Sequence, residues 1–257
     1  MLNKVKTMKN YKLESLDGEI GKVKELYFDD KHWTTRYLVV ETGNWLTNRQ
    51  VLISPYALDA VNKDKQSIYI KLTKKEIEDS PPLDSNKPVS RQYEEAYYGY
   101  YGWPVYWAGS LMWGYDSMIV RDPAKWKKSI HGKTDDPNLR STEEVSGYYI
   151  HAKDGEIGHI EDFIVDDITW AIRYLIVNTQ NWLPGKSVLI SPKWIKAVSW
   201  GESKVFIDLT KDDIKQAPEF TDESLITRDY EILLHSHYKI DGYWLKKPAK
   251  KKHSKNK

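Results

Sequence analysis

The sequence predicts a mainly β protein made of two small β-barrels in tandem, each followed by a short helix and joined by an aromatic-rich linker. The first observation behind this is internal repetition: residues 11–107 align without a gap with residues 148–244, each 137 positions after its partner. The second is that each copy contains short strand-like runs separated by turn signals. The third is length, because 257 residues leave room for two domains of about 100 residues each. Matching over a whole unit indicates a duplicated domain.

The first half of the unit is expected to hold two strands. Residues 20–28 and 37–40 are partly alternating or β-branched runs without a helix-length apolar stripe. Asp17-Gly18 precedes them and recurs as Asp154-Gly155, and this dipeptide favours a tight hairpin turn. Asp29-Asp30 then falls between strands, where short polar side chains satisfy the backbone of a turn and where a calcium site lacks further oxygen ligands.

The second half of the unit adds two more strands and a helix. Residues 51–53 form a strand that ends at Ser54-Pro55, since proline removes a donor from the ladder. Residues 57–61 are interpreted as a short helical or irregular turn, and residues 68–72 as a strand. Thr73 and Glu76 match a capping box, which predicts a brief helix. Because closure removes the exposed edges of so short a sheet, roughly five or six strands and one terminal helix favour a small barrel.

Four repeated motifs carry a resemblance to a known family. They are Asp17-Gly18-Glu19-Ile20-Gly21, Arg36-Tyr37-Leu38-Val39-Val40, Asn44-Trp45-Leu46 and Val51-Leu52-Ile53-Ser54-Pro55. Together they resemble the PRC-barrel family, and the tandem form resembles bacterial proteins labelled as photosynthetic reaction-centre H-subunit-like. The family also includes the C-terminal domain of a ribosome maturation factor. The resemblance implies two PRC-type barrels with a role in binding or assembly.

The predicted organisation has four parts. These are a first PRC-barrel domain over residues 1–93, an aromatic-rich linker over 94–146, a second PRC-barrel domain over 147–245, and a disordered lysine-rich tail over 246–257. Within the linker, Ser141-Thr142-Glu143-Glu144 predicts a short helix. The tail carries seven lysines while the whole chain has a net charge of +2, so the remainder is mildly acidic. Most such tails are solvated, and the alternative is that this one attracts nucleic acid or an anionic membrane without sequence specificity.

Residues 96–115 are uncharged and hold six tyrosines, four glycines and one proline. That composition argues against a lipid-buried helix, because tyrosine and tryptophan prefer interfaces. The favoured interpretation is that the segment lies across a barrel and fills an apolar groove, with the opposite copy as one candidate for that barrel. The alternative is contact with a partner or a membrane interface. The candidate contact residues in this segment are Tyr100, Tyr101, Trp103, Tyr106 and Trp107.

Two further residue pairs are candidates because both copies hold them. Arg36 and Arg173 are expected to pair with Asp29 and Asp166 respectively, with anion binding as the minority interpretation. The other pair is Trp45 and Trp182. Both are expected on a loop, either as recognition residues or folded over the barrel mouth.

Several function classes find no support in the sequence. Zero cysteines exclude thiolate chemistry and favour a reducing interior such as the cytoplasm. Residues 1–9 lack the apolar core of a secretory signal, and no transmembrane segment is expected. His235 and His237 could share one strand face, yet no third zinc ligand accompanies them. Because no catalytic constellation or phosphate loop is present, we expect neither an enzyme nor a bound cofactor or metal.

The leading hypothesis is a non-enzymatic adaptor that binds a protein partner, in the cytoplasm or peripheral to the membrane, through the linker aromatics and the two tryptophan loops. The first alternative is an RNA- or ribosome-associated factor, motivated by the basic tail and the maturation-factor relatives. The second is a photosynthetic reaction-centre-associated protein, which follows from family resemblance only. Homo-oligomerisation is left open.

Overall fold

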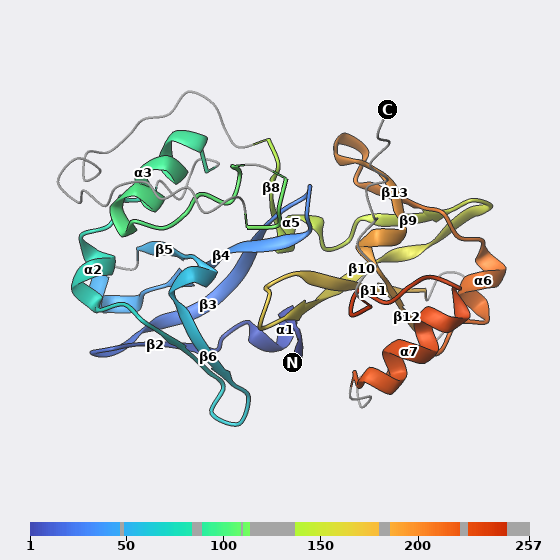
Figure 1. The fold of residues 1–257 in the computed structure, drawn as a ribbon, viewed down its shortest axis with the longest axis horizontal. Helices are drawn as coiled ribbons and strands as arrows, with labels where there is room; N and C mark the ends of the chain where they lie inside the picture. The colour runs from blue at the N-terminus through green and yellow to red at the C-terminus, as the bar shows by residue number, and fades with distance from the viewer. Residues whose placement is uncertain are drawn as a thin grey trace, which may run out of the picture.

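Two seven-stranded sheets, one for each repeat, form the protein (Figure 1). The computed structural model describes residues 1–46, 49–83, 89–108, 110–113, 137–179, 186–221 and 226–245. The first sheet contains β2 (Lys12–Ser15), β3 (Gly18–Asp29), β4 (Thr34–Glu41), β5 (Gln50–Ile53), β6 (Leu58–Asn62), β7 (Ser67–Ile70) and β8 (Leu139–Ser141). The second contains β1 (Leu2–Lys4), β9 (Tyr149–Ala152), β10 (Gly155–Asp166), β11 (Ile172–Asn178), β12 (Ser187–Ile190), β13 (Ile195–Ser199) and β14 (Lys204–Ile207).

Short helices connect and cover the strands. They are α1 (Val5–Met8), α2 (Lys74–Glu78), α3 (Arg91–Tyr101), α5 (Thr142–Val145), α6 (Lys211–Lys215) and α7 (Arg228–His237), with 3-10 turns at Gly43–Leu46, Pro55–Ala57, Pro192–Trp194 and Trp200–Glu202. The expected capping box of α2 is present. The helix predicted near residue 141 is α5, whose N-cap Ser141 accepts hydrogen bonds from two backbone N–H groups. These sequence-based helix predictions are confirmed.

The strand order is the same in the two repeats. It runs β5-β4-β3-β2-β7-β6 in the first sheet and β12-β11-β10-β9-β14-β13 in the second, with β2–β7 and β9–β14 as the parallel pairs. The prediction of a closed barrel is not met by the hydrogen bonding, because over the described residues no ladder joins β5 to β6. A side chain covers the β5 edge instead: the Tyr97 hydroxyl of α3 donates to the Leu52 carbonyl at 2.9 Å and accepts from the Ser54 N–H at 3.1 Å. Covering an edge with a helix is an alternative to closing the sheet.

Two local predictions were wrong, and one segment without a predicted conformation begins as a helix. Residues 57–61, expected as a turn, mostly form strand β6, since pairing with β7 satisfies their backbone. Residues 96–115 begin as a helix, because Ser90 caps the start of α3 and Gly102 ends it at a φ of 71°. His235 and His237 lie on α7 and not on a strand.

The two repeats exchange their leading strands. Strand β1, at the start of the chain, pairs with β10 of the second sheet, while β8, which precedes the second repeat, pairs with β3 of the first. Leu2 and Leu139 occupy equivalent places, so the repeat extends further toward the N-terminus than the sequence comparison indicated. Figure 1 shows both arms, with α1 and α5, near the middle of the molecule. The predicted boundaries after residues 93 and 146 do not anticipate this exchange.

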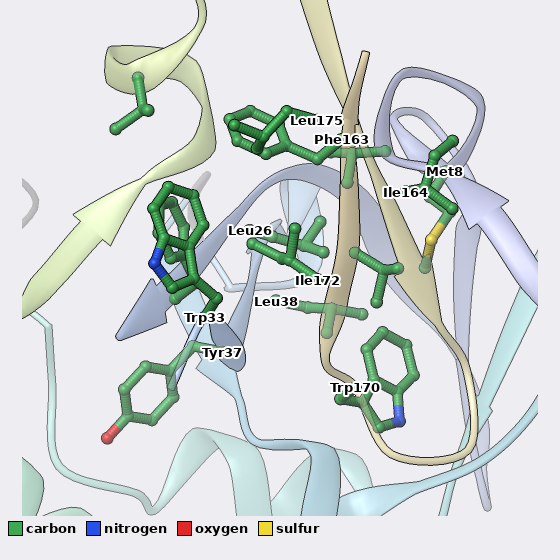
Figure 2. Packing of buried hydrophobic residues seen from close by; sticks show 14 of the residues in the cluster. Met8, Leu26, Trp33, Tyr37, Leu38, Phe163, Ile164, Trp170, Ile172 and Leu175 are labelled. Carbon is green, nitrogen blue, oxygen red and sulfur yellow. The ribbon is translucent and has the colours of Figure 1, made fainter. Parts of the chain in front are cut away.

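One continuous hydrophobic core spans both sheets. Figure 2 shows side chains of the first repeat, such as Leu26 and Leu38, beside Ile172 of the second. The rings of Phe28 and Phe163 lie 5.9 Å apart across the junction. Backbone hydrogen bonds also cross it, from the Ile172 N–H to the Trp33 carbonyl at 2.7 Å and from the Thr35 N–H to the Trp170 carbonyl at 2.8 Å. The repeats are therefore joined by main chain and core as well as by the exchanged arms.

The repeated Asp-Gly-Glu-Ile-Gly motif has a structural explanation in both copies. Asp17 accepts a hydrogen bond from the Lys74 N–H at the start of α2, and Asp154 does the same at α6, both at 2.8 Å. A side chain at Gly21 would place its Cβ 2.0 Å from a carbonyl oxygen of β4, and one at Gly158 would lie 1.9 Å from β11. Only glycine allows the strands to approach so closely.

Candidate partner-binding groove

Trp45 folds over the end of its own sheet. It lies in the 3-10 turn Gly43–Leu46, and its indole N–H donates to the Ile20 carbonyl. Trp45 and Ile20 of strand β3 both border a cavity of about 570 Å³. The Lys74 ammonium lies 5.6 Å from the ring centroid. Trp45 is half-buried beside this cavity, and its role in recognition stays a prediction. Trp182 lies outside the described residues.

The two arginines make the predicted ion pairs. Arg36 contacts Asp29 at 2.6 Å, and Arg173 contacts Asp166 at 2.7 Å. Arg36 is fully buried, and its guanidinium lies 4.1 Å from the Tyr106 ring and 4.6 Å from the Trp113 ring. Burial raises the pKa of Asp166, but the hydrogen bonds from Arg173 and its neighbours outweigh burial and leave that pKa below its ordinary value. Each guanidinium stabilises the turn that follows the long strand of its repeat. Because Arg36 is fully buried, its guanidinium has no exposed surface for an external anion.

Most of the described part of the aromatic segment packs against the sheet of its own repeat, in agreement with the packing interpretation, and the opposite copy is not the surface that it covers. Tyr100 and Tyr101 are only 5% and 6% exposed, and their hydroxyls point to the Glu76 carbonyl of α2. Tyr106 is 4% exposed. These three tyrosines therefore have little surface with which to contact a partner. Trp103 and Trp107 are half-buried and pack on the tyrosines beneath them.

In each repeat a buried glutamate holds the second helix after the sheet, α3 or α7, against that sheet. Glu94 accepts hydrogen bonds from the Tyr37 hydroxyl at 2.9 Å and the Tyr106 hydroxyl at 2.6 Å, and it pairs with Arg91 at 3.0 Å. The second copy has the same arrangement: Glu231 accepts a hydrogen bond from the Tyr174 hydroxyl at 2.8 Å and pairs with Arg228 at 2.9 Å. The pKa of Tyr243 is raised, first by burial and second by a hydrogen bond to Glu231. Burial raises the pKa of Tyr37 and Tyr174 far above the ordinary value. Because these carboxylates are enclosed and their partners are fixed, the arrangement serves packing.

A groove between the two repeats combines apolar surface with access to solvent. Its volume is about 440 Å³. It is lined by Pro55, Tyr56, Leu58, Asp59, Ala60 and Val61 of the first repeat, Asp167, Ile168 and Trp170 of the second, and Trp113 of the linker. We refer to these residues as the inter-repeat groove.

Three elements position the groove. The turn Pro55–Ala57 and strand β6 form one wall, with the Ser54 N-cap fixing the turn. The loop between β10 and β11 forms the other wall, where Trp170 takes a left-handed φ of 59°. Trp113 bridges the walls: its ring lies 5.1 Å from that of Tyr56, and its indole N–H donates to the Thr169 carbonyl at 3.3 Å. At the rim of the groove Ile168 is 81% exposed.

Sequence reasoning missed the groove residues because it favoured positions that both copies share. Tyr56 and Ile168 correspond to Lys193 and Lys31 in the other copy. The usable signal was therefore the difference between copies, an aromatic or apolar residue replacing a lysine at a turn. Among the predicted contact residues, none lines the groove itself; it is their neighbour Trp113 that reaches it.

No three histidine, aspartate or glutamate side chains gather as a metal site within the described part of the chain. In the same residues, no helix is long and apolar enough to cross a membrane. Burial lowers the pKa of His235, which is enclosed by Tyr174 and the Ile240 carbonyl. That histidine belongs to the packing of α7 on its barrel.

The PRC-barrel domain model matches two stretches of the chain, residues 13–77 and 144–214, which together make up more than half of it. The chain belongs to the PRC-barrel family. Each match begins in or near the first strand of one repeat and ends in or just after the helix that follows the sheet, so the family model and the two sheets agree. PRC-barrel domains commonly mediate protein interactions. Among curated proteins, none is similar enough to this PRC-barrel protein to be recognised as a relative.

Proposed function

We propose that this tandem PRC-barrel protein is a non-enzymatic adaptor that binds a protein partner in the inter-repeat groove. The observation that carries the proposal is the groove itself: three aromatic rings and the exposed Ile168 surround a cavity of about 440 Å³. Aromatic side chains are enriched at the centre of protein interfaces. The groove needs both repeats, which gives the duplication a use that one PRC domain alone would lack.

The partner surface differs from the one the sequence suggested. Tyr100, Tyr101, Tyr106 and Arg36 act as support, because they are buried and hold the linker in place. Trp103 and Trp107 keep partial exposure on the same repeat. We assign the contact to Tyr56, Trp113 and Ile168 in the first place, with the buried Trp170 supporting the groove wall.

The test is a pull-down from extracts of the native host after mild cross-linking. Ile168→Glu places a charge at the groove rim, and Leu16→Glu is the matched control, since Leu16 is 68% exposed on the β2–β3 turn and does not line the groove. The proposal predicts a protein recovered with the wild type and with Leu16→Glu but lost with Ile168→Glu. A partner recovered equally with all three proteins would contradict it.

The alternatives are separated by a fourth sample. An RNA- or ribosome-associated role rests on residues 246–257, which lie outside the described residues, and a reaction-centre-associated role rests on family resemblance alone. A version that ends at residue 245 is therefore compared at low and moderate salt. Ribosomal or nucleic-acid material that depends on the tail and on low salt would favour the first alternative. Recovery of reaction-centre subunits would favour the second.

A further inference from the structure

Strand β6 ends the first sheet with an edge that no other strand of the described chain covers. The sheet order stops at β6, which pairs only with β7. Asp59 and Ala60 in its centre are exposed, and a bulge lies between Leu58 and Ala60. An uncovered edge presents unpaired N–H and C=O groups and is a template for another strand.

The inter-repeat groove runs along this edge. Four consecutive residues of β6, from Leu58 to Val61, line it. Successive side chains of a strand point to opposite faces. A cavity that contacts four in a row therefore follows the edge of the strand and reaches its main chain. The opposite wall, with Ile168 and Trp170, belongs to the second repeat.

The charge of the groove selects a basic occupant. Asp59 and Asp167 line it, and none of its lining residues is basic. Asp59 pairs with Lys71 at 3.1 Å, but both side chains are more than half exposed, and such surface pairs contribute little. Asp167 is already paired with the N-terminal ammonium of Met1 and accepts a hydrogen bond from the Asn3 amide at 3.1 Å. Asp59 is therefore the carboxylate that can take a lysine or arginine from an incoming chain.

The equivalent edge of the second sheet carries lysines that oppose pairing with another strand. Strand β13 also ends its sheet. There, however, Lys193 and Lys196 stand where the first repeat has Tyr56 and Asp59. Lysines on an edge strand are a common device against unwanted strand pairing. The difference between the copies makes β6 the edge that is open to a partner.

We infer that β6 binds an extended segment of the partner protein by strand addition, with alternate apolar side chains in the inter-repeat groove and lysine or arginine opposite Asp59. In this mode main-chain hydrogen bonds supply affinity and the pocket for alternate side chains supplies specificity. The inference rests on the proposed function, because it names the form of the partner at the same groove.

The experiment selects random nine-residue peptides on the full-length protein and measures the affinity of the selected peptides by fluorescence anisotropy. The expected peptides alternate apolar and polar residues and carry lysine or arginine. N-methylation at the residues that face β6 should weaken binding more than about tenfold, while N-methylation at the intervening residues should be tolerated. Asp59→Lys, which copies Lys196 of β13, should weaken binding by at least about as much, and Leu16→Glu should leave it unchanged.

Three results would overturn the inference. The first is that no selected peptide depends on Asp59 or Ile168 for binding. The second is that helical peptides bind in the groove. The third is that N-methylation is tolerated equally at the peptide residues that face β6 and at the intervening residues. If the host partner still requires Ile168 when one of these is found, the adaptor function stands and strand addition is rejected. If the host partner is also indifferent to Ile168, both are rejected.

Discussion

Asp162 on β10 is a buried carboxylate at the junction with the N-terminal arm, and its titration should make the stability of the protein depend on pH. It is 4% exposed and accepts the Lys6 N–H at 3.1 and 3.2 Å. Burial raises its pKa from 3.8 to about 6, and the nearby Lys6 and Lys4 do not offset this. Its counterpart Glu25 meets the other arm through Ser141, and burial raises its pKa as well.

A raised carboxyl pKa means that the folded state binds the proton more tightly than the unfolded state does. Stability is therefore gained as pH falls through about 6 and is complete below 3.8. The full effect is about 3 kcal/mol, of which about 2 kcal/mol falls between pH 7.5 and 4.5. Asp162→Asn removes the titration and keeps an acceptor for the Lys6 N–H. Relative to this variant, the wild type should gain about 2 kcal/mol between pH 7.5 and 4.5.

The assay is urea unfolding of the wild type and Asp162→Asn at several pH values. Asp17→Asn is an informative control of opposite sign, because the Lys74 N–H and the Ser15 hydroxyl lower the pKa of Asp17. That variant should be less stable than the wild type at neutral pH, and the difference should shrink as pH falls. A difference between wild type and Asp162→Asn that is independent of pH, or that grows in favour of the wild type at neutral pH, would refute the reasoning.

Three further substitutions test the fold by chemical denaturation. Gly21→Ala should destabilise by roughly 3–5 kcal/mol, because its Cβ would lie 2.0 Å from a backbone carbonyl at a φ of 150°; a loss below about 1 kcal/mol would mean that the strands separate easily. Tyr37→Phe removes one donor to the buried Glu94 carboxylate and should cost about 1–3 kcal/mol, and an unchanged midpoint would show that water replaces it. Thr142→Val removes the acceptor of the buried Leu26 N–H at the exchanged arm and should cost a similar 1–3 kcal/mol; no loss would show that the arm is held by other contacts.

The sequence predicts those parts of the fold that local chemistry determines. The turn at Asp17-Gly18, the capping box at Thr73 and the N-cap at Ser141 are each set by a few neighbouring residues, and all appear in the structure. The Arg36–Asp29 pair was also predictable, because both residues flank one turn and recur in the second copy.

Other features depend on tertiary contacts. The exchanged strand β1 has only three residues, too few for a periodic signal, and its partner β10 is more than 150 residues away. Helix α3 is rich in tyrosine and contains Gly99, and both residue types have weak helix propensity. Its start and end signals, Ser90 and Gly102, were available in the sequence, but burial of its tyrosines against β5 and α2 decides the structure.

The candidate site could not be predicted because it lies between the repeats. Tyr56, Trp113 and Trp170 are far apart in the chain and meet only when the second repeat docks on the first. The sequence comparison favoured residues held in both copies, whereas the groove uses residues that differ between them. Residues that differ between the two copies were thus more informative for the proposed binding groove, and residues that are identical in both copies were more informative for the fold.

The most direct test of the central claim is photo-cross-linking in the native host, with a photoreactive amino acid replacing Ile168 in one variant and Leu16 in another. Both positions are exposed, so both probes report on whatever protein lies against them. The account predicts a discrete cross-linked protein at position 168 that is missing at position 16. A discrete partner at position 16 with none at position 168 would contradict the assignment of the inter-repeat groove as the binding site.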